Sequence, residues 1–97
     1  MKNYRNERVA SVITENLNLI FQKEFDFGSA LVTIVNTEVE KDLSEAKIKI
    51  AVIPSDQELA VYQTINSKKR YLQNKLLKIL NIKPMPALSF LIEKHSN

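Results

Sequence analysis

The residue types that this sequence lacks exclude several kinds of function. Its 97 residues include no cysteine, no tryptophan, one glycine and one histidine. Without cysteine there is no disulfide framework and no thiolate metal site, which fits a reducing compartment. A single glycine excludes the phosphate-binding loops that need several. The one histidine, His95, is almost terminal and has no second His or Cys to join it. We therefore expect no metal, no cofactor, no small-molecule substrate and no enzyme.

Long apolar runs are also missing. The opening residues MKNYRNER are polar, and no stretch reaches the roughly 18 apolar residues that a membrane span needs. The chain is 44% hydrophobic and 26% charged, which is ordinary for a soluble globular protein. Its length fits a single domain over residues 1–97. We expect a cytoplasmic monomer that does not contact membranes.

Acidic residues are absent from one long segment. Residues 1–58 hold seven Lys/Arg and ten Asp/Glu, whereas residues 59–92 hold six Lys/Arg and no Asp or Glu. The second segment therefore has a charge of +6 within a chain of net charge +3. A one-sided distribution of this kind attracts and holds an anionic partner.

The hydrophobic pattern predicts the order helix, strand, strand, helix, helix, strand. Apolar spacings of three and four predict a helix over residues 4–24, and Gly28 is a natural turn after it. β-Branched residues predict a strand over 30–40, and alternation predicts a second over 46–52 with its lysines facing outward. The connection between them, residues 41–45, is of hairpin length. Residues 87–92 are the last expected strand.

Between the second and third strands we expect two helices. Ser55 and Glu58 have the S-x-x-E spacing of a capping box, which predicts a helix start. Helical periodicity then runs from Leu59 to Leu80. One helix over residues 56–81 would be about 39 Å long, too long for a domain of this size. We therefore expect a break or kink within residues 66–69.

The second of these helices would have a basic face. At 100° per residue, Tyr71, Lys75 and Lys78 fall within about 60° of one another. The opposite side, facing the core, would hold the apolar residues Leu72, Leu76 and Ile79. Lysines around an aromatic ring suit nucleic acid, because the charges meet phosphates and the ring stacks on a base or sugar. The alternative is an ordinary solvated surface with Tyr71 bordering the core.

Alternating carboxylates form the other candidate cluster. Glu38, Glu40 and Asp42 could share one side of an extended strand and offer oxygen ligands to Mg²⁺. A solvated acidic edge is the favoured interpretation.

Several segments, in order, resemble one protein family. The opening helix has Arg5-x-x-Arg8-Val9-Ala10 and Gln22-x-Glu24, and the hairpin has Asp42-Leu43-Ser44-x-Ala46-Lys47-Ile48. Near the end stands Ile82-Lys83-x-x-Pro86-Ala87-Leu88-x-Phe90. Over nearly its whole length the chain is similar to ribosome-binding factor A, a bacterial assembly factor of the small ribosomal subunit.

The resemblance implies an α+β fold of the type II KH kind. Its three-stranded sheet would pack against three helices, and a kinked helix pair would replace the GXXG loop with which ordinary KH domains grip RNA. The family's kink is written A-x-G, but the aligned triplet here is Lys68-Lys69-Arg70. Many members carry a longer C-terminal tail, so we expect any function of that tail to be absent or truncated here.

The resemblance also implies a partner and a task. The partner would be the immature small (30S) ribosomal subunit and its ribosomal RNA, and the task late maturation and rRNA processing without catalysis, often linked to growth in the cold. The expected RNA contacts comprise a basic group and four further residues. They are Lys68, Lys69, Arg70, Lys75 and Lys78, then Tyr71, Lys83, Arg5 and Arg8. The alternative for Arg5 and Arg8 is that they form ion pairs with Glu7 or Glu15 and do not contact RNA. The rival hypothesis is a protein-interaction module on the same fold that docks through a sheet edge or the first helix.

Overall fold

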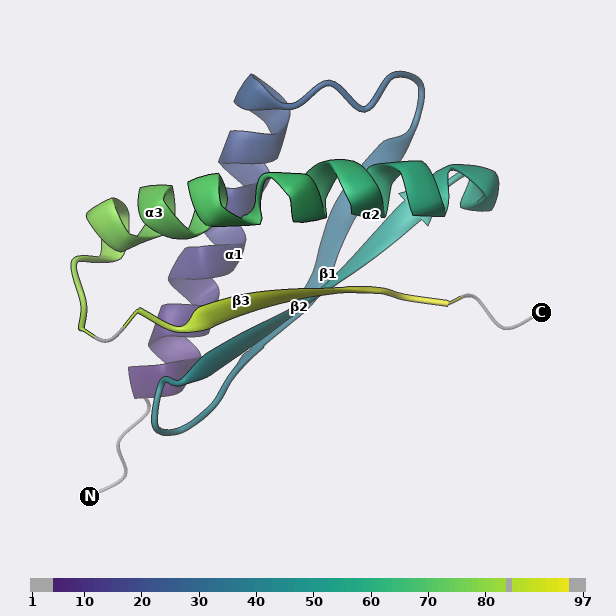
Figure 1. The fold of residues 1–97 in the computed structure, drawn as a ribbon. Coiled ribbons are helices and arrows are strands. Elements are labelled where there is room, and N and C mark those ends of the chain that lie inside the picture. Colours follow the sequence, from purple (N-terminus) through teal and green to yellow (C-terminus); the bar gives the residue numbers. More distant parts are fainter. Residues whose placement is uncertain (1–4, 84, 95–97) are drawn as a thin grey trace.

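The computed structural model describes residues 5–83 and 85–94 (Figure 1). It confirms the expected order of elements. The helix α1 spans Arg5–Glu24 and precedes the hairpin strands β1 (Leu31–Val39) and β2 (Glu45–Ile53). A 3₁₀ turn, η1 (Ser55–Gln57), leads into α2 (Glu58–Ser67) and α3 (Lys69–Leu80), and β3 (Ala87–Ile92) ends the fold.

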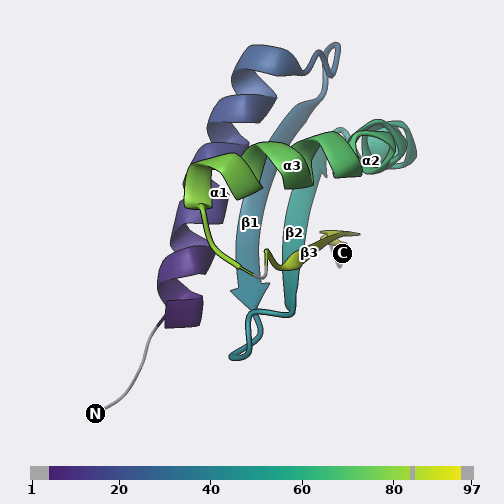
Figure 2. The ribbon, with the colours of Figure 1, turned by 60° about the vertical axis from the view of Figure 1, so that its left-hand side comes forward.

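The three strands form one sheet, and all three helices pack on the same face of it (Figures 1 and 2). The strand order is β1-β2-β3, with β1 antiparallel and β3 parallel to β2. The parallel pairing needs a long crossover, which α2 and α3 supply. Along β2, Ala46, Ile48, Ile50 and Val52 are fully buried, whereas Lys47 and its odd-numbered neighbours point to the outer face. The predicted alternation is thus confirmed.

A β-bulge at Val35 divides β1 into two halves. Ile34 pairs with Ile50, but the next paired residue, Asn36, lies opposite Lys49, so Val35 has no partner. Before the bulge the inward positions carry even numbers, and after it they carry odd numbers. One extra residue on one strand shifts the side-chain alternation by one, as the period of two requires.

The hairpin tip explains the D-L-S-x-A-K run. Leu43 adopts a φ of 63° and buries its side chain in the core. Its N–H donates to the Glu40 carbonyl at 2.8 Å, and the Ser44 N–H donates to Asp42 Oδ1 at 3.0 Å. Hydrogen bonds from the side chain of Ser44 and then from its backbone N–H lower the pKa of Asp42 below its ordinary value. The side chain of Asp42 therefore stabilises the turn that directs Leu43 inward.

An aromatic cluster fixes the end of α1. Phe21 lies edge-on to Phe25 and Phe27, with ring centroids 5.2 and 5.6 Å away, and the last two rings stack at 5.5 Å. Asp26 Oδ1 accepts the Gly28 N–H at 2.9 Å, and Gly28 has a φ of 64°. The expected turn at Gly28 is confirmed, and the rings hold it against the core.

The start of α2 differs from the prediction. The capping box is wrong, because Ser55 lies in η1 and α2 begins at Glu58 without a side-chain cap. Leu59 is also not in the core: it is 67% exposed, whereas Val61 and Ile65 are buried. The 3₁₀ turn supplies the helix entry that the capping box was expected to make. Leu59 lies about 160° around the axis of α2 from Val61, which places it on the outward side.

The bulge predicts which residue of β1 can be removed. Deleting Val35 leaves the inward side chains on both sides of it in regular alternation, so all of them keep facing the core. We expect urea denaturation to show a free energy of unfolding changed by less than about 1 kcal/mol. Deleting Glu38 from the regular half should instead turn the buried Val39 toward solvent and lower the free energy of unfolding by about 1.5–3 kcal/mol. An equal loss of stability in the two deletion variants would contradict the role given to the bulge.

Candidate nucleic-acid interface

The expected break between the two helices is confirmed and lies at Lys68. Lys68 has a φ of −103° and a ψ of 13° and lies between the end of α2 at Ser67 and the start of α3 at Lys69. The Lys68 N–H donates to the Ile65 carbonyl at 3.0 Å, while the Lys68 carbonyl accepts from Leu72 at 2.9 Å. The Ser67 hydroxyl donates to the Thr64 carbonyl at 2.8 Å, a bond that bends helices. Because φ is negative, the break needs no glycine.

The break turns the two helices in different directions. Figure 2 shows α2 nearly end-on while α3 is seen from the side. Both helices therefore reach the sheet: α2 packs on β2 and β3, and α3 packs on α1 and β3. The corner between them carries Lys68 on its exposed side.

The basic triplet does not project in one direction. Neighbouring residues of a helix lie about 100° apart, so three in a row spread around the axis. Lys68 and Arg70 are exposed, whereas Lys69 is half-buried on the side that faces the core. The triplet therefore places positive charge on two sides of the corner and does not form a single basic patch.

A longer row of side chains lies along one side of α3. It consists of Lys68, Tyr71, Lys75 and Lys78, whose spacings of three and four keep them within about 80° of one another. We call these four residues the α3 stripe. Tyr71 is 46% exposed, so its ring does not belong to the core.

The opposite side of α3 is buried, with one exception. Leu72 and Leu76 are fully buried as predicted, but Ile79 is 45% exposed and its prediction as a core residue is wrong. Leu80 packs against the core instead. The side chains that face the core are therefore spaced four residues apart. Each step of four turns about 40° further around the helix axis, so Ile79 lies beside the α3 stripe and not among the buried residues.

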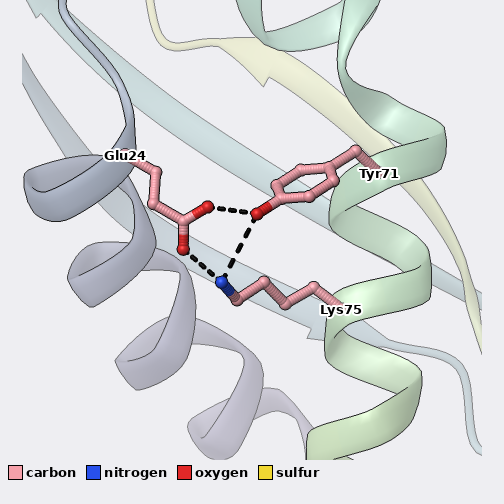
Figure 3. Close-up of polar contacts among 3 residues, drawn as sticks. All are labelled: Glu24, Tyr71 and Lys75. Carbon is pink, nitrogen blue, oxygen red and sulfur yellow. Dashed lines mark hydrogen bonds and ion pairs between the residues drawn. The ribbon is translucent and has the colours of Figure 1, made fainter.

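Glu24 lies opposite the middle of the stripe (Figure 3). The Tyr71 hydroxyl donates to one oxygen of its carboxylate, and Lys75 Nζ donates to the other. Lys75 Nζ also lies 3.4 Å from the Tyr71 hydroxyl and 5.7 Å from the centre of its ring. The contact joins the last residue of α1 to α3, and the sequence did not predict it.

The contact shifts two pKa values in opposite directions. Hydrogen bonds from Lys75 and then Tyr71 lower the pKa of Glu24 below its ordinary value of 4.5. The hydrogen bond to Glu24 and then that to Tyr71 raise the pKa of Lys75 above 10.5. The carboxylate and the ammonium therefore both stay charged at neutral pH.

A surface hollow adjoins this contact. It has a volume of about 350 Å³ and is lined by Glu24, Phe25, Asp26, Thr64, Lys68 and Tyr71. It connects the corner at Lys68 with the Tyr71 ring, so the two features form one continuous surface.

The other predicted contacts lie elsewhere. Lys83 is exposed in the loop between α3 and β3. Arg5 and Arg8 are exposed in the first turns of α1, at the opposite end of that helix from Glu24. At 1.5 Å per residue, Arg5 and Glu24 are about 28 Å apart along the helix axis. The structure therefore does not bring the two arginines to the corner.

The described part of the chain shows neither a metal-ligand cluster nor a membrane-spanning helix. Within residues 5–83 and 85–94, no three His, Cys, Asp or Glu side chains are placed to hold a metal ion. Glu38, Glu40 and Asp42 are all exposed. Of the helices described here, none has the length and apolar composition needed to cross a bilayer. His95 lies outside the described residues.

A family model now decides the classification. The model of ribosome-binding factor A matches residues 5–97. The chain belongs to the ribosome-binding factor A family. Among curated members, the protein of Chlorobium limicola is 36% identical over 73 residues, covering 74% of this chain and 61% of the relative. The chain spans about half to two thirds of the length of most curated relatives that it matches.

Solved structures of ribosome-binding factor A share the fold. The solution structure of a putative member from Thermotoga maritima gives a TM-score of 0.78 at 20% identity, covering 100% of this chain and 94% of that one. A Thermus thermophilus ribosome-binding factor A model, fitted into a cryo-EM map of its complex with the 30S subunit, gives 0.73 at 19% identity and covers 99% of both chains. These likenesses confirm the predicted α+β architecture.

The pKa of Glu24 measures its contact with α3. We expect an NMR titration of the Glu24 carboxyl to give a pKa below 4.5, moving back toward that value in the variant Lys75→Gln. Because the folded-state pKa is lowered, the contact stabilises the protein above pH 4.5 and this contribution disappears as the pH falls through the folded-state pKa. For Lys75 the contribution is complete below pH 10.5 and disappears as the pH rises through its higher folded-state pKa. A Glu24 pKa of 4.5 in the unmodified protein would contradict the contact.

Proposed function

We propose that this protein is a non-enzymatic assembly factor that binds the small ribosomal subunit and contacts its ribosomal RNA. The α3 stripe and the corner at Lys68 would form the contact. The observation that carries the proposal is a row of cations around an exposed aromatic ring, in a segment without acidic residues; Lys68 and Lys78 are exposed, and Lys75 between them is half-buried. The fitted complex of the Thermus thermophilus family member with the 30S subunit supports the choice of partner.

The side chains of this surface determine which parts of an RNA it would contact. Lysine and arginine side chains bind phosphates, which position a protein on RNA without specifying sequence. The exposed Tyr71 ring and the adjoining hollow suit an unpaired base or a sugar. Specificity would then come from the shape of the RNA in the assembling particle. The factor would act in the cytoplasm, in late maturation and rRNA processing.

Arg5, Arg8 and Lys83 have a smaller place in this proposal. Arg5 and Arg8 lie at the far end of α1 from the corner, so they would contact a different stretch of RNA. Lys83 lies in the loop after α3 and would contact RNA only where the strand continues past Lys78.

One observation favours the alternative of a protein-interaction module. The outer face of the sheet carries Leu31, 67% exposed, directly opposite Ile53, 57% exposed. Leu91 on β3 is 45% exposed on the same face. An apolar group of this kind suits a protein partner. Binding there would depend weakly on salt and would not involve the α3 stripe.

Co-sedimentation with purified small ribosomal subunits, immature and mature, across a salt series tests the proposal. Engaging about five phosphates gives a slope of log affinity against log salt between roughly −3.5 and −4.5. The variant Lys68→Gln/Lys78→Gln removes the two exposed lysines at the ends of the stripe. It should weaken binding about tenfold or more and make the slope shallower by about 1.4–1.8. Lys69 is left unchanged because it is half-buried.

The matched control is Lys41→Gln/Lys47→Gln, which removes two exposed charges from the hairpin and the outer sheet face. It should keep the slope and nearly all of the affinity. If Leu31→Ser abolishes binding while Lys68→Gln/Lys78→Gln does not, the protein-interaction alternative replaces the proposal. Failure to bind either particle would reject the ribosomal function.

A further inference from the structure

The α3 stripe is a row of phosphate ligands with a carboxylate placed against it. Lys68 and Lys78 stand at its ends, and Glu24 of α1 holds the two residues between them. The Tyr71 hydroxyl and Lys75 Nζ both donate to this carboxylate. In the free protein, the centre of the proposed RNA-binding row is thus already occupied by an anion.

The two groups that donate hydrogen bonds to Glu24 are of the kind that also bind phosphate oxygens. Lysine ammonium and tyrosine hydroxyl groups are common ligands of phosphate oxygens in nucleic acids. We infer that Tyr71 and Lys75 form a binding site for one phosphate of the RNA backbone, and that Glu24 fills this site until RNA displaces it. The inference rests on the proposed function for the identity of its ligand and adds to it a defined anion site and a competitor.

The helix α3 sets the spacing of the two donors. Tyr71 and Lys75 are four residues apart on α3, where side chains lie side by side. Lys75 Nζ lies 3.4 Å from the Tyr71 hydroxyl and 5.7 Å from the ring centre, so both donors already face one point. If Glu24 withdraws, the pair remains available to another anion.

Displacement of Glu24 is physically easy. The side chains of Lys75 and Glu24 are 37% and 30% exposed, and an ion pair this open to water contributes little stability. Glu24 is the last residue of α1, so its side chain can turn toward solvent without disturbing a helix turn beyond it. The hollow beside it gives an incoming strand access to Tyr71 from the side of Lys68.

The competitor would favour RNA that engages the whole stripe. An isolated phosphate must displace Glu24 with no other gain, whereas RNA lying along α3 also meets Lys68 and Lys78. These two residues are about 15 Å apart along the axis. Displacing Glu24 costs both ligands the same free energy, and only the strand gains further contacts that offset this cost.

The decisive variant is Glu24→Gln, assayed by co-sedimentation with purified small ribosomal subunits. Removing the competitor should lower Kd about two- to fivefold, the range set by an exposed ion pair. The matched control Glu15→Gln removes the same charge from an exposed position on α1 and should change Kd less than about 1.5-fold. In a Lys75→Gln background, Glu24→Gln should give no further gain, because the site that it frees no longer exists.

Inorganic phosphate probes the same site without RNA. In an NMR titration of Glu24→Gln, phosphate should move the signals of Tyr71 and the Lys75 side chain. The same titration of the unmodified protein should need several-fold more phosphate. Thermal unfolding of each variant checks that the fold is intact.

The outcomes separate the inference from the proposed function. Weaker subunit binding by folded Glu24→Gln would show that Glu24 positions the stripe, and it would overturn the inference while the proposed function stands. Unchanged binding together with no phosphate response at Tyr71 and Lys75 would overturn it equally. A phosphate response in Glu24→Gln, with no binding of any variant to subunits, would keep the anion site and reject the ribosomal function.

Discussion

The fold depends on a single interruption in the helical segment between β2 and β3. At Lys68 one backbone N–H bonds to the carbonyl three residues back instead of four, and the helix changes direction. Ile65 before the break and Leu72 after it are both fully buried in the same core. A straight helix of that length would carry one of its ends past the small sheet. The break therefore lets a domain of 97 residues cover the sheet with two short helices and close a single core.

The same break creates the surface that we propose to bind RNA. It exposes Lys68 at a corner and sets α3 across the end of α1, where the aromatic cluster of Phe21, Phe25 and Phe27 fixes the chain. Glu24 lies between the first two of these rings in the sequence, and its side chain reaches the middle of α3. Packing of the core thus decides which charges meet: the apolar sides of α1 and α3 are buried, and their polar edges are brought into contact.

Sequence reasoning predicted the features that depend on local patterns. The order of elements, the last strand at 87–92 and the break near Lys68 follow from periodicity, length and charge. The bulge at Val35 was not predicted, although the two halves of β1 have their apolar positions out of phase by one residue. Ile79 was wrongly placed in the core because a fixed 100° projection ignores the crossing angle between helix and sheet. The Glu24 contact could not be predicted, since it joins residues 47 and 51 positions apart that meet only once α1 and α3 have packed.

The central claim is that RNA lies along α3, and chemical footprinting of lysines tests it most directly. Lysines occur on every side of the molecule, so acetylation followed by mass spectrometry of the protein alone and bound to small ribosomal subunits maps the contacting face. The account predicts that binding protects Lys68, Lys75 and Lys78 while Lys41 and Lys47 stay reactive. Protection of Lys47 and Lys49 on the outer face of the sheet, with the α3 stripe still reactive, would contradict it.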